Sequence, residues 1–325
     1  MIASTALEAS GEEDAVTWFT PILRNWIGFA YLGDYLSYAL WLIVPVLLVY
    51  SLPLAIYCFV CVVNFALYIY QKKNNMQEHP SSKSWDKARK VVSYLVRSFG
   101  KIWHGFEIIG LEHLPEGSGL IIYYHGALGI DYACFVSTLY ILTGRCCYSV
   151  SDHFLFGIPG IQLVLGLTGC GDRNKADCVA FLKKGELLGI APGGLREQNF
   201  SDGNYNLIWG NRTGFAQVAT EAKVPIIPIF TQNTREAYWT FGNTWLTRWL
   251  YESIRWVILP VYGGFPVKLR TYIGEPIPYD PNITAKELAE KTKTAIENLR
   301  DRYQKRPGNI MKAFLERFDK HHKEN

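Results

Sequence analysis

A histidine and an aspartate near the end of an apolar run could act together as a catalytic base and its orienting carboxylate. The run Leu120–Tyr124 is typical of a buried strand, and His125, a Gly-containing turn and Asp131 follow it. A rigid strand aims a side chain while the loop beyond it leaves that side chain accessible. An imidazole takes up a proton near neutral pH, and a carboxylate fixes its tautomer and stabilises the imidazolium. A lone histidine at a strand end is more often structural, so the hypothesis needs support from other parts of the chain.

Three more blocks with chemical potential follow in order along the chain. The first is Gly169–Arg173, the second is the Ala-Pro-Gly-Gly-Leu-Arg-Glu segment 191–197 directly after an apolar run, and the third is Val224–Ile229. The backbone N–H groups of Gly193 and Gly194 are candidates to stabilise an oxyanion, because such groups commonly bind the negative charge that develops during acyl transfer.

The order and spacing of these four blocks resemble the glycerolipid acyltransferases of the lysophosphatidate and diacylglycerol acyltransferase superfamily. In that superfamily the blocks are H-x4-D, a segment ending in Arg, often F-P-E-G, and a Val-Pro-Ile-Ile-Pro-like strand. The segment Asn211–Phe215, followed by Val224–Phe230, also resembles the neutral-lipid, diacylglycerol-acylating branch. The resemblance covers about residues 30 to 320. It implies that His125 removes the proton of an acceptor alcohol, which attacks the acyl carbonyl directly without a nucleophilic serine.

The sequence departs from the superfamily pattern at two positions. Five residues, rather than four, separate His125 from Asp131, and Gly126 and Gly129 give the loop the freedom to absorb the extra one. In the third block, Gly193 occupies the position of the Glu in F-P-E-G. That Glu is associated with holding a glycerol headgroup, so the change disfavours a glycerol-phosphate acceptor. Glu197 is a candidate to replace it.

Several charged residues have both a functional and a structural interpretation. Arg173 could bind a phosphate of donor or acceptor, or pair with Asp172. Arg196 and Glu197 could orient substrate, or form a structural pair. Arg212 could contact a donor headgroup, or lie solvated at a helix start.

Composition disfavours metal and nucleic-acid chemistry. The seven cysteines follow no disulfide or zinc spacing, and the Cys58-x-x-Cys61 pair lies in an apolar run without a second pair. The adjacent Cys146 and Cys147, together with the odd count, are typical of a reducing compartment. A net charge of +4 does not point to nucleic acid. We therefore expect no metal and no bound cofactor.

A membrane segment precedes the four blocks. Leu36–Tyr70 contains no charged residue, and these 35 residues would span about 50 Å as one helix, against a hydrocarbon core of about 30 Å. Pro45 and Pro53 lie inside the segment, and Ser51-Leu52-Pro53 is a plausible turn. We predict a transmembrane helical hairpin, with a single kinked span as the alternative.

Charge at the ends of this segment predicts its orientation. Lys72 and Lys73 close it, whereas the N-terminal segment 1–35, which could be interfacial, is acidic. Basic residues prefer the cytoplasmic side of a membrane. We expect the catalytic domain to be cytoplasmic, at the endoplasmic reticulum membrane.

The rest of the chain alternates between strand-like and helix-like runs, which predicts an α/β domain with a largely parallel sheet. Residues 71–100 are assigned to a linker and leading helix, 101–310 to the acyltransferase domain, and 311–325 to a charged tail. A Thr284–Glu287 capping box opens a long helix that runs to about Lys305. The predicted strands are Leu120–Tyr124, Cys146–Val150, Leu187–Ile190, Val224–Phe230 and Val267–Ile273, and the other predicted helices are Tyr132–Leu142, Lys175–Lys184 and Gly214–Glu221.

Residues 237–260 are rich in tryptophan, which prefers membrane interfaces. We interpret this segment as a membrane-facing element near an acyl-chain entrance, with ordinary core packing as the alternative. Arg248 and Arg255 could meet lipid headgroups.

These features favour a membrane-bound O-acyltransferase that makes triacylglycerol from diacylglycerol, with monoacylglycerol as another acceptor and acyl-CoA or a phospholipid as acyl donor. A lysophospholipid acyltransferase is the alternative within the same class. A lipase-like hydrolase would need a G-x-S-x-G elbow, which the sequence lacks. A non-catalytic lipid-binding protein would not need the His125–Asp131 pair.

Overall fold

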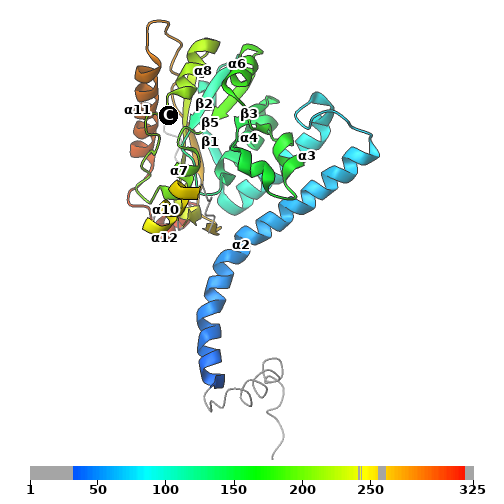
Figure 1. Cartoon of the computed structure of the whole chain (residues 1–325), viewed down its shortest axis with the longest axis vertical. Coiled ribbons are helices and arrows are strands. Elements are labelled where there is room, and N and C mark those ends of the chain that lie inside the picture. Colours follow the sequence, from blue (N-terminus) through cyan, green and yellow to red (C-terminus); the bar gives the residue numbers. More distant parts are fainter. Residues whose placement is uncertain (1–31, 241, 243, 255–260, 319–325) are drawn as a thin grey trace, which may run out of the picture. The chain divides into compact units, whose positions relative to one another are not determined.

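The computed structural model describes residues 32–240, 242, 244–254 and 261–318 (Figure 1). The chain divides into two compact units, residues 1–51 and 52–325, and every candidate site residue lies in the second. Most of the acidic N-terminal segment, the end of the charged tail, Arg255 and Trp256 lie outside the described residues.

The predicted α/β fold with a largely parallel sheet is confirmed. In the described residues, seven strands form one sheet in the order β1-β9-β6-β2-β5-β3-β4, with all neighbours parallel except the antiparallel pair β6–β9. The strands are β1 (Glu107–Ile109), β2 (Gly119–Tyr123), β3 (Cys147–Val150), β4 (Cys170–Gly171), β5 (Leu187–Ile190), β6 (Ile226–Gln232) and β9 (Arg270–Ile273). A separate antiparallel ribbon pairs β7 (Tyr238–Thr240) with β8 (Val261–Gly263).

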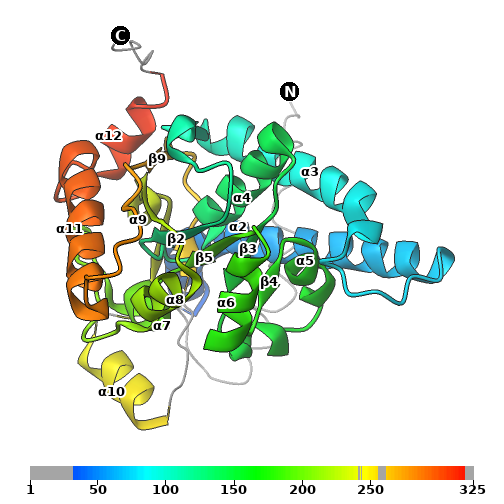
Figure 2. The same cartoon turned by 90° about the horizontal axis from the view of Figure 1, so that it is seen from above.

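Helices cover both faces of this sheet (Figure 2). Alternate side chains of β2 point to opposite faces, as the two-residue period of a strand requires. Leu120 and Ile122 pack with α6, α8 and α11, whereas Ile121 packs with α4. The helices are α3 (Asp86–His104), α4 (Ile130–Thr143), α5 (Gln162–Leu167), α6 (Lys175–Lys183), α7 (Gly194–Phe200), α8 (Gly214–Ala222), α9 (Thr234–Ala237), α10 (Trp245–Ile254), α11 (Ala285–Tyr303) and α12 (Ile310–Leu315), with short 3-10 turns η1 (Lys83–Trp85), η2 (Leu111–His113) and η3 (His153–Gly157).

The register of the central strands places two of the predicted blocks side by side. Ile122 of β2 pairs with Ile190 of β5 in parallel, so His125 and Gly193 each lie three residues beyond that pair. Adjacent strands are about 4.8 Å apart. The histidine and the glycine turn therefore meet at the carboxyl edge of the sheet.

The predicted helical hairpin is wrong. Residues Leu32–Lys73 form one helix, α2, and Pro45 and Pro53 both lie inside it. A proline removes a single helical hydrogen bond, whereas a turn would leave several backbone groups unpaired in an apolar run that has few polar side chains to satisfy them. The part of α2 from Tyr50 to Lys73 is long and apolar enough to cross a membrane.

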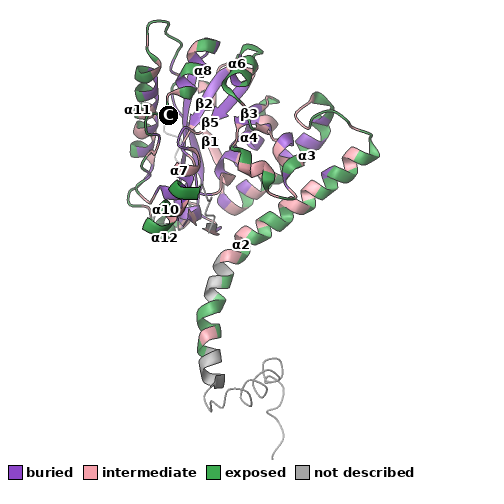
Figure 3. Cartoon of the chain, viewed as in Figure 1, coloured by how far each residue is buried: buried purple, intermediate pink, exposed green. Residues whose placement is uncertain are grey.

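The second half of α2, from Leu52 onward, packs along one side against the α/β domain. The Asn64 side-chain oxygen accepts hydrogen bonds from the backbone N–H groups of Leu163 (2.9 Å) and Val164 (3.3 Å) at the start of α5, and the Tyr57 hydroxyl donates to the Pro159 carbonyl at 2.9 Å. Exposed apolar positions such as Phe59 and Val62 occur between the partly buried ones (Figure 3). One face of the helix thus packs against the domain, and none of the residues that the structure describes covers its other, apolar face.

We expect Gly189→Ala to destabilise the domain by about 2 kcal/mol, because overpacking a tight core typically costs 1–3 kcal/mol. A Cβ at residue 189, in β5, would lie 1.8 Å from the hydroxyl oxygen of Tyr132. Thermal unfolding in detergent measures the effect. Gly117→Ala is the matched control, since nothing lies within 4 Å of its added Cβ. Equal unfolding temperatures for the two variants would contradict the packing described for α4 on β5.

Candidate active site

The His125 imidazole is held by a neighbouring backbone carbonyl. Its Nδ1 lies 2.7 Å from the Gly126 carbonyl oxygen. Because a carbonyl oxygen only accepts, Nδ1 carries the proton and Nε2 carries the lone pair. Burial lowers the pKa of the imidazole from 6.5, although the bond to Gly126 opposes this shift. His125 is therefore a neutral base with an available Nε2 at neutral pH.

Asp131 does not make the predicted hydrogen bond to His125 in the described structure. It lies buried in the first turn of α4, where backbone N–H groups of Tyr132 and Asp131 itself bond its carboxylate. Burial raises its pKa to about 6. The carboxylate packs against Gly126, where an added Cβ would lie 3.0 Å from Oδ1. The loop between His125 and Asp131 is one residue longer than in the superfamily pattern. The Gly126 carbonyl, rather than the Asp131 carboxylate, orients the His125 imidazole.

The glycine turn offers one backbone donor where the sequence suggests two. The Gly194 N–H donates to the Ala191 carbonyl at 3.1 Å, which closes the turn. Arg212 donates to the carbonyl oxygens of Pro192 (2.7 Å) and Gly193 (3.0 Å). In a trans peptide the C=O and the following N–H point in opposite directions. Because Arg212 binds the Pro192 carbonyl, the N–H of Gly193 in the same peptide points away from Arg212. Gly193 is therefore a better candidate for an oxyanion donor than Gly194.

The Glu197 carboxyl group connects the backbone at His125 to the backbone at Ile208. Its side chain is completely buried, and Oε2 accepts the backbone N–H of His125 at 2.8 Å while Oε1 accepts that of Ile208 at 3.0 Å. Burial raises its pKa to about 7, and these two hydrogen bonds oppose the shift. A Cβ at residue 193 would lie 2.4 Å from the Glu197 Cβ. Glu197 thus fills the space that a side chain at residue 193 would need, which explains the glycine there. The Glu197 carboxyl group faces the backbone rather than a substrate.

Arg235 is a buried residue of this site that the sequence analysis missed. Its side chain is 1% exposed, and its guanidinium donates to the carbonyl oxygens of His125 (3.3 Å), Glu197 (2.5 Å) and Gln198 (3.0 Å), and to the Tyr124 hydroxyl (2.8 Å). A buried charge needs such complete hydrogen bonding. Arg235 therefore ties the end of β2 to α7. The only available signal is a charged residue that closely follows the apolar run Val224–Phe230.

Two other predicted residues have structural partners. Arg173 donates to the Ser149 carbonyl at 2.5 Å, and its guanidinium lies 4.8 Å from the Phe181 ring centroid, while Asp172 pairs with His153 instead. It follows the edge strand β4, three strands and about 14 Å from β2.

Arg196 pairs with α10 rather than with its neighbour Glu197. Its guanidinium nitrogen NH2 lies 2.6 and 2.8 Å from the two carboxylate oxygens of Glu252. The predicted structural pair between Arg196 and Glu197 is therefore wrong.

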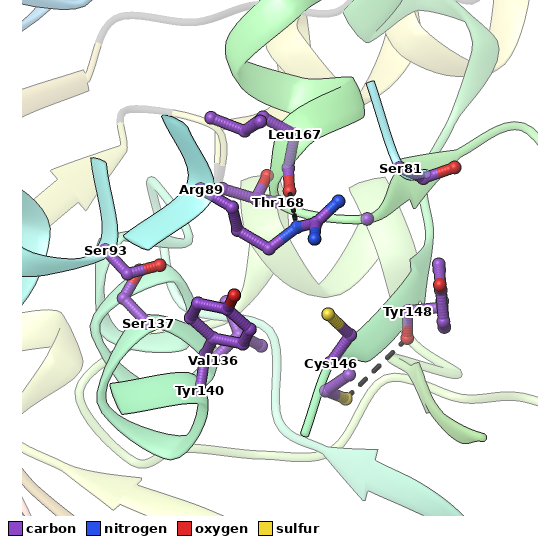
Figure 4. Close-up of a pocket in the computed structure, with 12 residues that line it drawn as sticks. Ser81, Arg89, Ser93, Val136, Ser137, Tyr140, Cys146, Tyr148, Leu167 and Thr168 are labelled. Carbon is purple, nitrogen blue, oxygen red and sulfur yellow. Dashed lines mark hydrogen bonds between the residues drawn. The ribbon is translucent and has the colours of Figure 1, made fainter. Parts of the chain in front are cut away.

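A surface pocket lies at the amino ends of the strands, away from His125 (Figure 4). Its lining residues Cys146 and Thr168 precede β3 and β4, so the pocket lies opposite the edge that carries His125. The Arg89 guanidinium in it donates to the carbonyl oxygens of Leu167, Pro80 and Ser82, each at 3.0 Å. No group of three or more His, Cys, Asp or Glu residues that could hold a metal ion occurs in the part of the chain that the structure describes.

Comparisons with known proteins assign this site to a family. Residues 105–232, which include His125, the glycine turn, Glu197 and Arg212, match the acyltransferase family. A mouse relative is 48% identical over 99% of this chain and 99% of its own length, and a human relative is 50% identical over 91% and 93%. The chain belongs to the acyltransferase family. Both relatives bear the name "DGAT1/2-independent enzyme synthesizing storage lipids".

The comparison with solved structures found a further similarity. The crystal structure of the 1-acyl-sn-glycerophosphate (LPA) acyltransferase PlsC from Thermotoga maritima is 17% identical, with a TM-score of 0.45, and the match covers 75% of this chain and 96% of that one. The resemblance drawn from the four sequence blocks is confirmed by the family match. At Trp103–Gly105, Asp152–Phe154 and Pro307–Ile310 the acyltransferase sequence also resembles transmembrane protein 68.

We expect Arg235→Lys to lower kcat about 100-fold with little change in KM, because small displacements of a catalytic group have effects of this size. A lysine keeps the charge but loses the forked geometry that reaches three carbonyls at once. Initial rates at saturating acceptor measure the change. Arg302→Lys, at an exposed position of α11, is the control. Wild-type turnover by a folded Arg235→Lys protein would show that this arginine does not position His125.

Proposed function

We propose that this acyltransferase forms triacylglycerol from diacylglycerol, with His125 as general base and monoacylglycerol as a second acceptor. The observation that carries the proposal is the neutral His125 imidazole, with its Nε2 lone pair available, beside the glycine turn. It occurs in a chain about as long as its mouse relative and 48% identical to it, and that relative is named for the synthesis of storage lipids.

In the proposed reaction the acceptor hydroxyl gives its proton to Nε2 of His125 as its oxygen attacks the acyl carbonyl. The Gly126 carbonyl retains the proton on Nδ1, so the imidazolium forms in a fixed orientation. The Gly193 N–H stabilises the developing oxyanion. The attack forms the new C–O bond and gives a tetrahedral intermediate. As this intermediate collapses, the carbonyl re-forms, the bond to the donor breaks, and Nε2 returns its proton to the leaving group. Asp131 stabilises the imidazolium through space.

The partners of the charged residues support an uncharged acceptor. Glu197 is buried against the backbone, so no carboxylate occupies the position of the headgroup-binding Glu of F-P-E-G. Arg173, Arg196 and Arg212 are held by Ser149, Glu252 and the glycine turn respectively. A lysophosphatidate acceptor would need a free cation for its phosphate. Diacylglycerol has no such requirement.

We further propose acyl-CoA as the donor, the default of the superfamily, with a phospholipid as the alternative, and no bound cofactor. The proposed location is the endoplasmic reticulum membrane with the catalytic domain cytoplasmic. Two features support this orientation: the part of α2 that is long enough to cross a membrane, and the basic pair Lys72 and Lys73 at its end.

The test offers the purified full chain labelled diacylglycerol, monoacylglycerol or lysophosphatidate, each with acyl-CoA or phospholipid as donor. We expect triacylglycerol, and a loss of about 1,000-fold in His125→Ala, since general-base catalysis contributes 10²–10⁴-fold. Phosphatidate as the sole product would overturn the proposed acceptor. Full activity of His125→Ala would overturn the mechanism.

We expect kcat/KM to be retained below pH 6.5 and to fall only at more acidic pH. Burial lowers the pKa of His125, so the neutral base persists until the pH drops through this lowered value, where protonation removes the lone pair. A pH–rate profile in mixed micelles measures the acid limb, with unfolding followed over the same range. An acid limb centred above pH 6.5 would contradict the assignment of His125 as the titrating base.

A further inference from the structure

Helix α10 presents an apolar face that no described residue covers. Trp245 and Trp249 lie one turn apart and are 79% and 58% exposed, and Leu246 is exposed as well. Tyr251, on the other side of the helix, is buried. Two exposed tryptophans on one short helix are unusual for a surface that meets only water, since tryptophan buries a large apolar area.

This helix is attached to the segment that follows the glycine turn. The Arg196–Glu252 ion pair, at 2.6 and 2.8 Å, joins α7 to α10, and the Tyr251 ring meets the Phe200 ring edge-on at 5.2 Å between centroids. Helix α7 begins at Gly194 and contains Glu197, which accepts the backbone N–H of His125. A displacement of α10 would therefore reach the helix that holds the His125 backbone.

The ribbon on either side of α10 in the sequence packs against helix α2. Helix α10 lies between β7 and β8 in the chain, and Gly264 directly follows β8. A Cβ at Gly264 would lie 2.4 Å from a methyl carbon of Leu52, in the apolar part of α2 that is long enough to cross a membrane. Trp103 donates its indole N–H to the Gly264 carbonyl at 2.8 Å, which fixes this junction. The end of the ribbon therefore contacts the candidate membrane helix.

We propose that α10 is a second membrane-contact element, which inserts Trp245 and Trp249 into the interface of a lipid bilayer and is coupled to the catalytic turn by the Arg196–Glu252 pair. Tryptophan favours the headgroup level, where its ring meets both apolar and wet layers. The ribbon's junction with α2 selects a bilayer as the occupant over a protein partner. The contact with lipid stands on this geometry alone, whereas its coupling to catalysis rests on the proposed function.

The contact is tested by fluorescence depth measurement on the full chain in phosphatidylcholine vesicles. Trp249→Cys, in a background where the exposed Cys58 is serine, carries an NBD probe, and lipids with a doxyl group near the headgroup act as quenchers. The control probe is at Lys286→Cys, at an exposed position of α11. Labelling of the Cys58→Ser background without an added cysteine gives the signal to subtract.

We expect quenching and a blue-shifted emission at residue 249 and an aqueous, unquenched emission at residue 286. Equal, aqueous emission at both positions would overturn the membrane contact. A blue shift at 249 that lipid quenchers do not affect but that grows with protein concentration would instead identify a second copy of the chain as the occupant. Neither outcome depends on enzymatic activity, so it is separate from the fate of the proposed function.

The coupling is tested by exchanging the charges of the ion pair. We expect Arg196→Glu to lower acyl transfer in vesicles several-fold, and the double variant Arg196→Glu with Glu252→Arg to restore most of it, because the pair is re-formed with reversed polarity. An unchanged rate in the single variant, or no recovery in the double variant while residue 249 still contacts lipid, would overturn the coupling and leave the contact standing.

Discussion

The candidate site depends on one buried carboxyl group. Glu197 accepts the N–H groups of His125 and Ile208, and its side chain occupies the space directly against Gly193. Removing a carboxyl group from water is costly unless it is hydrogen-bonded, so these contacts are coupled: the carboxyl group stabilises the two backbone segments, and they make its burial possible. The end of β2 and the turn after β5 are thereby held as one unit. The glycine at residue 193 follows from this arrangement, since any side chain there would collide with Glu197.

Arg235 completes the unit from the next strand. It follows β6 and donates to three carbonyl oxygens, two of which belong to His125 and Glu197. Buried arginine and glutamate thus fix the backbone of His125, and the Gly126 carbonyl fixes its ring. Asp131 contributes a nearby buried carboxyl group without a direct bond to the imidazole. The longer loop between His125 and Asp131 is accommodated because the ring's orientation no longer depends on the aspartate.

Helix α2 packs against the domain beside strands that lead to the site. The Tyr57 hydroxyl of α2 donates to the Pro159 carbonyl in the segment that follows β3, and β3 is parallel to β5, which leads to the glycine turn. A Cβ at Gly264 would also lie 2.4 Å from a methyl carbon of Leu52 in α2. The proposed diacylglycerol acceptor has two long acyl chains, and taking them out of a membrane would expose a large apolar surface to water.

Local pattern determined much of this protein from its sequence alone. The runs Leu187–Ile190 and Lys175–Lys184 and the capping box at Thr284 correspond to β5, α6 and the start of α11, because propensity, periodicity and caps act between near neighbours. The order of the blocks along a parallel sheet likewise brought His125 and Gly193 together. Only the tertiary structure decided that α2 is one helix, that Arg196 pairs with Glu252, that Glu197 and Asp131 face backbone, and that Arg235 belongs to the site. The side-chain partners depend on which groups, distant in sequence, are brought together when the chain packs. The single helix α2 depends on the cost of leaving backbone groups unpaired in an apolar run, which the two prolines alone do not reveal.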